Sequence, residues 1–123
     1  MIKIEYFGEK EERHVGPIDI FVKLTYVNGA LKNERLKHIV RHSPDGFNFS
    51  YAGSGPADLA LSILTDFCNR KKISNSIVEE LYQRFKFDFI ANSGNKLSIN
   101  CIDIVNWLAT NKPELKGLLF KEE

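Results

Sequence analysis

The residue types best suited to chemistry lie in two short stretches, Arg41-His42-Ser43 and Gly53-Ser54-Gly55-Pro56. The first stretch carries a guanidinium, an imidazole and a hydroxyl in consecutive positions. Pro56 is typical of the first positions of a helix, so the glycine-rich turn should precede a helix N-terminus. Backbone N–H groups beside the positive end of a helix dipole favour an anion such as a phosphate or a carboxylate.

Tyr51 lies just before the turn and could stack on a base, which extends the predicted ligand to a nucleotide. The predicted ligand-binding residues are Arg41, His42, Ser43, Tyr51, Gly53, Ser54 and Gly55. The same residues also have a structural interpretation, in which the glycines form a tight corner and Arg41 pairs with Asp45 or Asp58. Asp58, in the first turn of the helix, would also repel an anion. The sequence leaves both interpretations open.

Catalytic and metal-binding patterns are weak. A nucleophile elbow has a glycine two residues on either side of its serine, whereas Gly53 and Gly55 flank Ser54 directly. His38 and His42 fall on a predicted strand, where residues four apart lie more than about 10 Å from each other, and no third ligand has fitting spacing. We predict no metal, no cofactor and a binding protein rather than an enzyme, with a small hydrolase using His42 and Ser54 as an alternative.

Composition places further limits on partners and compartment. A chain of 123 residues with 43% hydrophobic residues fits a single domain over residues 1–123. The net charge of +1 gives no general attraction to nucleic acid or to anionic lipid, so neither is an expected partner. Cys68 and Cys101 lie in apolar helical patterns, and the N-terminus reads as a strand rather than a signal peptide. We therefore expect a cytoplasmic protein.

Strand patterns occupy the first half of the chain. Alternating apolar residues predict strands over 2–7 and 18–27, and Asn28-Gly29 then predicts a hairpin turn. The returning strand begins either at Ala30-Leu31 or over 36–41. A further strand is predicted over 47–51.

Helical patterns occupy the second half. They begin at Pro56, at Ser76 with a capping box to Glu79, and at Asn100. A short amphipathic turn follows over 115–120, and residues 86–92 stay open between helix and extended chain. Strands followed by helices indicate an α+β fold, with a three- or four-stranded antiparallel sheet packed by about three helices.

Two segments of this chain resemble the signature of a small uncharacterised domain family of bacteria, phages and plasmids. They are Arg41-His42-Ser43-Pro44-Asp45-Gly46-Phe47 and Tyr51-Ala52-Gly53-Ser54-Gly55-Pro56-Ala57-Asp58-Leu59-Ala60-Leu61. The similarity extends over residues 20 to 108, with weaker matches at 82–86 and 104–108. Ala52 stands where the family usually has glycine. The resemblance implies a mobile-element setting and supplies no reaction.

The leading hypothesis is therefore a non-enzymatic binding protein of phage or mobile-element type. It would hold a phosphorylated small molecule or a nucleotide at the helix N-terminus and so counter a host defence, in the host cytoplasm if a phage encodes it. The alternative is an inhibitor or adaptor that blocks a host complex through its sheet edge or helices. A second copy of the chain is a further partner that the sequence leaves open.

Overall fold

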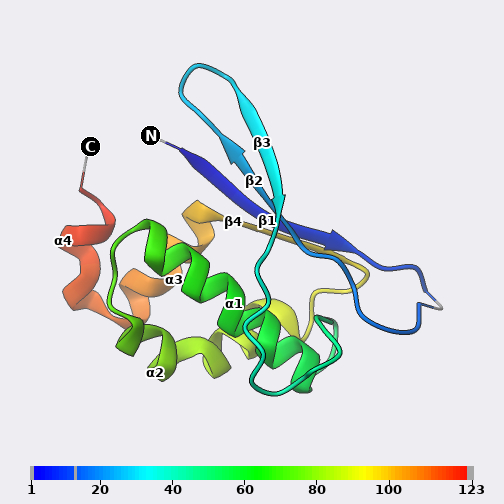
Figure 1. Cartoon of the computed structure of the whole chain (residues 1–123). Coiled ribbons are helices and arrows are strands. Elements are labelled where there is room, and N and C mark those ends of the chain that lie inside the picture. The colour runs from blue at the N-terminus through cyan, green and yellow to red at the C-terminus, as the bar shows by residue number, and fades with distance from the viewer. Residues whose placement is uncertain (1, 13, 122–123) are drawn as a thin grey trace.

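The computed structural model describes residues 2–12 and 14–121, and its architecture is α+β (Figure 1). Four antiparallel strands form one sheet in the order β3-β2-β1-β4. The strands are β1 (Lys3–Glu9), β2 (Phe21–Thr25), β3 (Leu31–Arg35) and β4 (Lys96–Asn100). The helical elements are α1 (Ser54–Arg70), α2 (Asn75–Phe85), η1 (Lys86–Ile90), α3 (Cys101–Asn111), η2 (Pro113–Leu115) and α4 (Lys116–Leu119). The predicted α+β class, with its antiparallel sheet, is confirmed.

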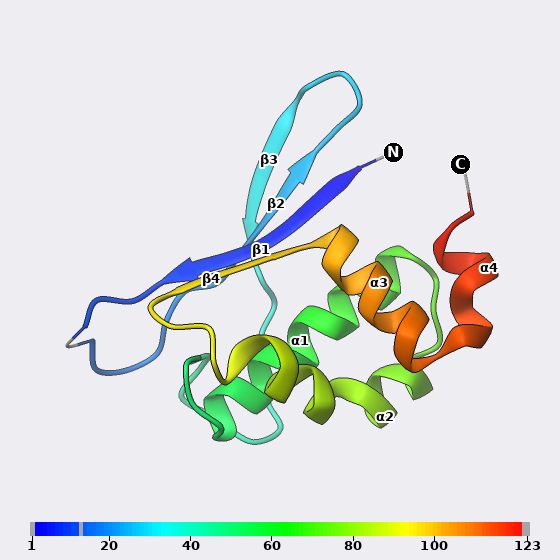
Figure 2. The ribbon, with the colours of Figure 1, turned by 180° about the vertical axis from the view of Figure 1, so that it is seen from behind.

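One face of the sheet is apolar because hydrophobic side chains alternate along its strands. Ile4 and Tyr6 of β1 pair with Leu24 and Val22 of β2, and all four side chains are buried. The helices lie on this side only, among the described residues, and leave the opposite face open (Figures 1 and 2). The core is therefore a single layer between one sheet face and the helices.

The β2–β3 hairpin forms where Asn28-Gly29 predicts it. Gly29 has φ +85°, and the Tyr26 N–H donates to the Ala30 carbonyl at 2.9 Å. β3 begins directly at Leu31, so the alternative strand over 36–41 is wrong. The chain leaves the sheet there because the Ile39 N–H donates to Ser62 Oγ on α1 at 2.9 Å instead of to a strand.

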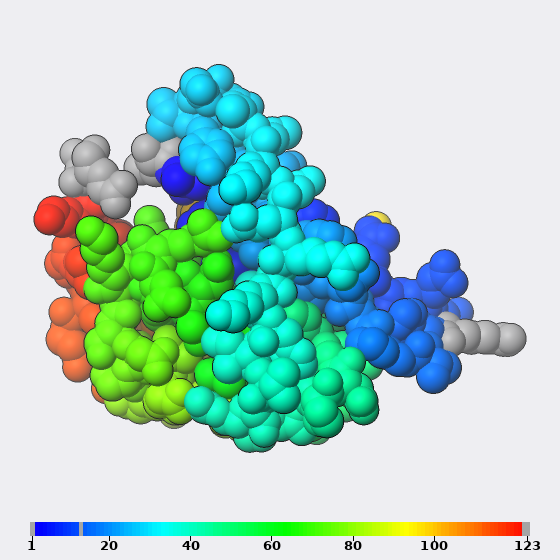
Figure 3. Space-filling model, viewed as in Figure 1, coloured from blue at the N-terminus to red at the C-terminus, as the bar shows by residue number. Residues whose placement is uncertain are grey.

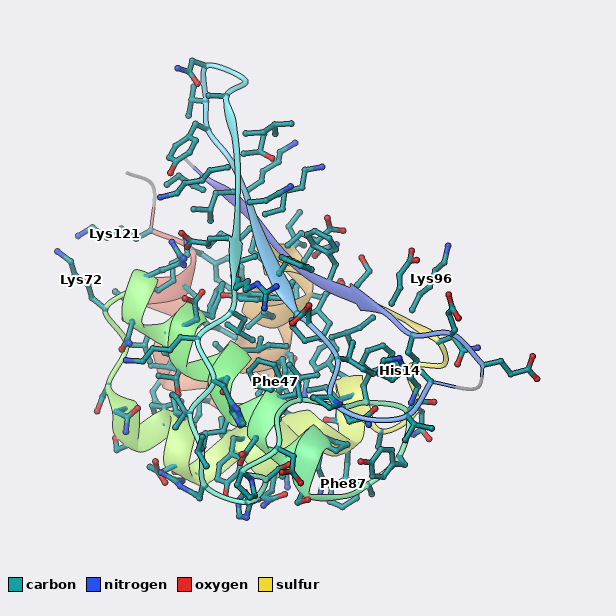
Figure 4. All side chains as sticks on the ribbon, turned by 45° about the vertical axis from the view of Figure 1, so that its right-hand side comes forward. His14, Phe47, Lys72, Phe87, Lys96 and Lys121 are labelled. Carbon is teal, nitrogen blue, oxygen red and sulfur yellow. The ribbon has the colours of Figure 1, made fainter. Side chains whose placement is uncertain are left out.

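Residues 36–53 form an irregular segment between the sheet and α1, and the strand predicted over 47–51 is also wrong. The backbone here bonds to unrelated elements: the Ile18 N–H donates to the Phe47 carbonyl and the Ser50 N–H to the Ile90 carbonyl. Phe47 and Phe49 are buried and pack into the core. Figure 4 labels Phe47 beneath the sheet. Figure 3 shows the segment, in cyan to blue-green, spread over one face beside the green surface of α1 and α2.

The fourth strand comes from the second half of the chain, just before the helix that the sequence predicts to begin at Asn100. β4 pairs with β1, with Tyr6 opposite Ile99 and Gly8 opposite Leu97. Asn100 ends β4 and also caps α3, its side chain accepting from the Asp103 N–H at 2.9 Å as the capping pattern predicts. The strand therefore passes into the helix without a connecting loop.

The helices follow the apolar periodicity of the sequence. α1 is the central helix and is buried over most of its length. α2 begins at Asn75, capped by Ser74 through the Ser76 N–H, so the predicted capping box from Ser76 to Glu79 is wrong. None of the helices within residues 2–12 and 14–121 combines the length and the hydropathy that crossing a bilayer requires.

The segment left open after α2 continues as a π-helix, η1. Its wider turn, with the Ala91 N–H bonded to the Lys86 carbonyl, buries both Phe85 and Ile90. Phe87 is turned outward and is 55% exposed at the edge of the molecule (Figure 4). The alternating aromatic pattern of Phe85-Lys86-Phe87-Asp88-Phe89 thus belongs to a helix, not to an extended chain.

Candidate functional site

A fully buried carboxylate organises the region that the sequence singles out. Asp58 lies on α1 and accepts hydrogen bonds from His38 Nε2 at 2.8 Å and from the His42 N–H at 2.8 Å. The Ser43 N–H donates to it at 3.0 Å, and the Arg41 N–H donates at 3.2 Å. Three consecutive backbone amides and one imidazole therefore converge on one side chain.

These contacts determine the ionisation of Asp58. Burial by itself would raise the pKa of this carboxyl, but the hydrogen bonds from His38, Ser43, His42 and Arg41 outweigh burial and hold the pKa below its ordinary value. The His38 ring also packs against Phe47, with ring centroids 4.6 Å apart. Asp58 is thus an internal anion that fixes residues 38–43 to α1, and the amides of Arg41, His42 and Ser43 face it rather than the solvent.

The Arg41 guanidinium points away from the glycine-rich turn. It donates to both carboxylate oxygens of Glu79 on α2, at 2.7 and 2.9 Å, and lies 5.6 Å from the Tyr82 ring centroid. These contacts raise the pKa of Arg41 and lower that of Glu79. Arg41 pairs with neither Asp45 nor Asp58 through its side chain, so that part of the structural interpretation is also wrong.

His42 is directed to the same helix. Its Nε2 lies 2.8 Å from the Tyr82 hydroxyl, and the two rings stack with centroids 5.9 Å apart. Among the described residues, no hydrogen bond joins His42 to Ser54. The side chains of Arg41 and His42 therefore bind α2 and hold the segment 36–53 against it. They do not lie at the glycine-rich turn.

Close packing around the turn favours glycine at both positions. A Cβ on Gly53 would lie 2.5 Å from Cε2 of Tyr51, whose ring covers the turn. A Cβ on Gly55 would lie 3.0 Å from Cβ and 3.1 Å from the backbone nitrogen of Asn48. Gly53 is the N-cap of α1 and offers no side chain to the first turn. The tight corner alone thus accounts for glycine at positions 53 and 55, without a bound ligand.

A small open hollow of about 250 Å³ lies at the N-terminus of α1. It brings together four of the seven predicted binding residues, Ser43, Tyr51, Ser54 and Gly55. The other residues around it are Gly16, Pro17, Asp45, Gly46, Phe47 and Asn48. Arg41, His42 and Gly53 do not line it. Its polar groups are hydroxyls, an amide and the Asp45 carboxylate, so the set could bind a hydroxylated ligand as well as an anionic group.

Lys10 is the nearby cation that sequence reasoning missed. Its Nζ donates to the Phe49 carbonyl at 2.6 Å and to Asn48 Oδ1 at 3.3 Å. The same ammonium lies 5.8 Å from the Tyr51 ring centroid. Lys10 follows β1 in a polar segment, far from Tyr51 in sequence, and no spacing pattern connects the two. Only the fold places this positive charge beside the hollow.

Metal binding has no support among residues 2–12 and 14–121, where no group of three or more potential ligands comes together.

Comparison with known proteins relates this chain to a protein family. A family of unknown function (DUF6166) matches residues 14–110, which agrees with the resemblance to an uncharacterised domain. No curated protein and no solved structure matches the chain.

Proposed function

We propose that this chain, which belongs to the family of unknown function DUF6166, is a non-enzymatic binding protein. Its ligand is a phosphorylated small molecule or nucleotide, held in the hollow at the N-terminus of α1. In a phage or mobile-element setting, such binding would withhold a signalling molecule from a host defence system. The compartment is then the cytoplasm of the host cell.

The observation that carries the proposal is the pair of amides at Ser54 and Gly55. These are the first residues of α1, and a helix provides no acceptor for its first N–H groups. Among the described residues, neither amide donates to a backbone carbonyl, and α1 has no side-chain cap. Tyr51 and Ser43 border the same hollow, so stacking and hydroxyl contacts would add to the binding of an anion.

One substitution tests the amides without disturbing the helix. Ser54→Pro removes an N–H from the first position of α1, where proline is well tolerated, and the extended backbone of Gly53 suits a following proline. Ser54→Ala removes the hydroxyl and keeps the amide. Calorimetric titration with nucleoside mono-, di- and triphosphates should show binding to wild type and Ser54→Ala, and loss of binding in Ser54→Pro. Equal binding by both variants would contradict the proposal.

The Asp45 carboxylate separates two kinds of ligand. It borders the hollow and would repel a bare phosphate, whereas it could accept hydrogen bonds from ribose hydroxyls. Asp45→Asn should therefore strengthen binding of inorganic phosphate and weaken binding of a nucleotide. Absence of binding of both ligands to every one of these proteins would contradict the proposal.

The second candidate is an inhibitor or adaptor that blocks a host complex. It is favoured by the open face of the sheet, where Phe7 and Phe21 lie side by side with ring centroids 5.7 Å apart. A host protein that binds there should be released by Phe21→Glu, and its binding should be unaffected by Ser54→Pro. Cross-linking from a photoreactive residue at position 23, on the same face of β2 as Phe21, would identify the partner.

A further inference from the structure

The outer edge of β3 pairs with no other strand among the described residues. β3 is the terminal strand in the order β3-β2-β1-β4, and four of its five residues are exposed. The hairpin that carries it projects from the body of the molecule (Figure 1). β3 contains no proline and no residue with positive φ. Proteins commonly block such edges with prolines, bulges or charged side chains, and of these devices β3 carries only the charges of Lys32, Glu34 and Arg35.

The direction of the free backbone groups follows from the pairing of β2 with β3. The Tyr26 N–H bonds to Ala30, and the Leu36 N–H bonds to Ile20, at the two ends of the same antiparallel register. Hydrogen-bonded and non-bonded pairs alternate along such a ladder. Lys32 and Glu34 therefore bond toward β2. The N–H and C=O groups of Leu31, Asn33 and Arg35 point to the open edge.

We infer that this edge pairs with the same edge of a second copy of the chain, about a two-fold axis through Asn33. In an antiparallel pair centred on Asn33, Leu31 lies opposite Arg35 of the other copy, and Asn33 lies opposite Asn33. These are the residues whose backbone groups point outward, so each opposed pair can exchange both of its hydrogen bonds. The two sheets then become one continuous sheet with an isologous interface.

The charges of Lys32 and Glu34 favour the register centred on Asn33 over the registers centred one residue to either side. Centred on Asn33, it places Lys32 opposite Glu34 of the other copy, and the symmetry repeats the pair. Moving the axis to Lys32 or to Glu34 places like charges opposite each other, which is destabilising. Within one chain, Glu34 already lies 3.5 Å from Lys32 and 2.7 Å from Arg70. Each copy therefore carries one positive and one negative side chain on either side of Asn33.

Sedimentation velocity of the full chain over a range of concentrations tests the inference. Wild type should move from the 14.1 kDa monomer toward twice that mass as concentration rises. Asn33→Pro removes the outward N–H and no bond to β2, so it should stay monomeric with an unchanged thermal transition. Asn33→Ser keeps the N–H and should associate like wild type. A wild type that is monomeric throughout, or an Asn33→Pro variant that dimerises equally, overturns the inference.

Charge exchange provides a test that does not depend on proline. Lys32→Glu places two carboxylates opposite each other at both symmetric positions, and dimerisation should weaken at least about fivefold. Adding Glu34→Lys to that variant restores opposite charges and should restore dimerisation. Failure of the double variant to recover, while it stays folded by circular dichroism, would show that the register is not centred on Asn33. Increasing salt should weaken the wild-type dimer in the same direction as Lys32→Glu.

Discussion

Replacing Asp58 by asparagine tests whether a buried anion organises residues 38–43. One oxygen of Asp58 accepts from the His42 N–H at 2.8 Å, and the other accepts from the Ser43 N–H at 3.0 Å and from His38 at 2.8 Å. Asparagine retains one acceptor oxygen and turns an NH2 group toward the remaining donors. The Ser43 amide would then have no acceptor, while His38 can adjust its tautomer.

The cost follows from these contacts. Leaving one buried donor without a partner costs about 1–3 kcal/mol, and the remaining bond loses its charge assistance, worth about 1 kcal/mol. Asp58→Asn should therefore lower the free energy of unfolding by about 2–4 kcal/mol, a large part of the stability of a small domain. Asp45→Asn is the matched control, because Asp45 is an exposed carboxylate in the same segment. Urea denaturation of the three proteins at neutral pH gives the comparison.

The pH dependence has a defined sign. The pKa of Asp58 is lower in the folded chain than its ordinary value of about 4. Its stabilisation is therefore complete above that ordinary pKa and is lost as the pH falls through the lowered, folded pKa. The difference in unfolding free energy between wild type and Asp58→Asn should shrink over this acidic window. A difference below about 1 kcal/mol at neutral pH, or one that grows on acidification, would refute the role assigned to Asp58.

Two smaller predictions concern the same region. Gly46→Ala should lower the unfolding free energy by about 1–3 kcal/mol, because Gly46 has φ +131° and a Cβ would lie 2.7 Å from Cβ of Pro17. Gly94→Ala, at φ +73° with open space around it, should cost less, and urea denaturation of both glycine variants gives the comparison. Tyr82→Phe removes the partner of His42 and should cost about 1 kcal/mol in urea denaturation. An unchanged midpoint would show that the hydroxyl contributes nothing.

Elements with strong local patterns could be predicted from the sequence. The hairpin follows from Asn28-Gly29 because a turn of this kind needs positive φ, which Gly29 has. α1 follows from its apolar periodicity. β4 was missed because five residues that alternate just before a helix cap give little local signal, and its partner β1 is distant in sequence. Long-range pairing, not propensity, makes that segment a strand.

The surroundings of the predicted binding residues could be foreseen only in part, because most of them depend on long-range contacts. The sequence pattern predicts that the helix begins at Pro56, whereas α1 begins at Ser54 with Gly53 as its N-cap, so Ser54 and Gly55 belong to the first turn itself. The directions of Arg41 and His42 depend on Glu79 and Tyr82, which lie on another helix. No spacing rule links side chains so far apart in the chain. Lys10 reaches Phe49 through the fold alone.

The contacts divide the residues of segments 41–47 and 51–61 into two groups, one that stabilises the fold and one that borders the hollow. Arg41, His42 and Asp58 are engaged in contacts with other residues of the chain, so substitutions there should change stability first and any binding second. Ser43 and Ser54 border the hollow, and their hydroxyls make no hydrogen bond with the described part of the chain, so their alanine variants should fold normally. Measuring unfolding and ligand binding on both groups therefore distinguishes a signature that maintains a loop from one that also maintains a ligand site.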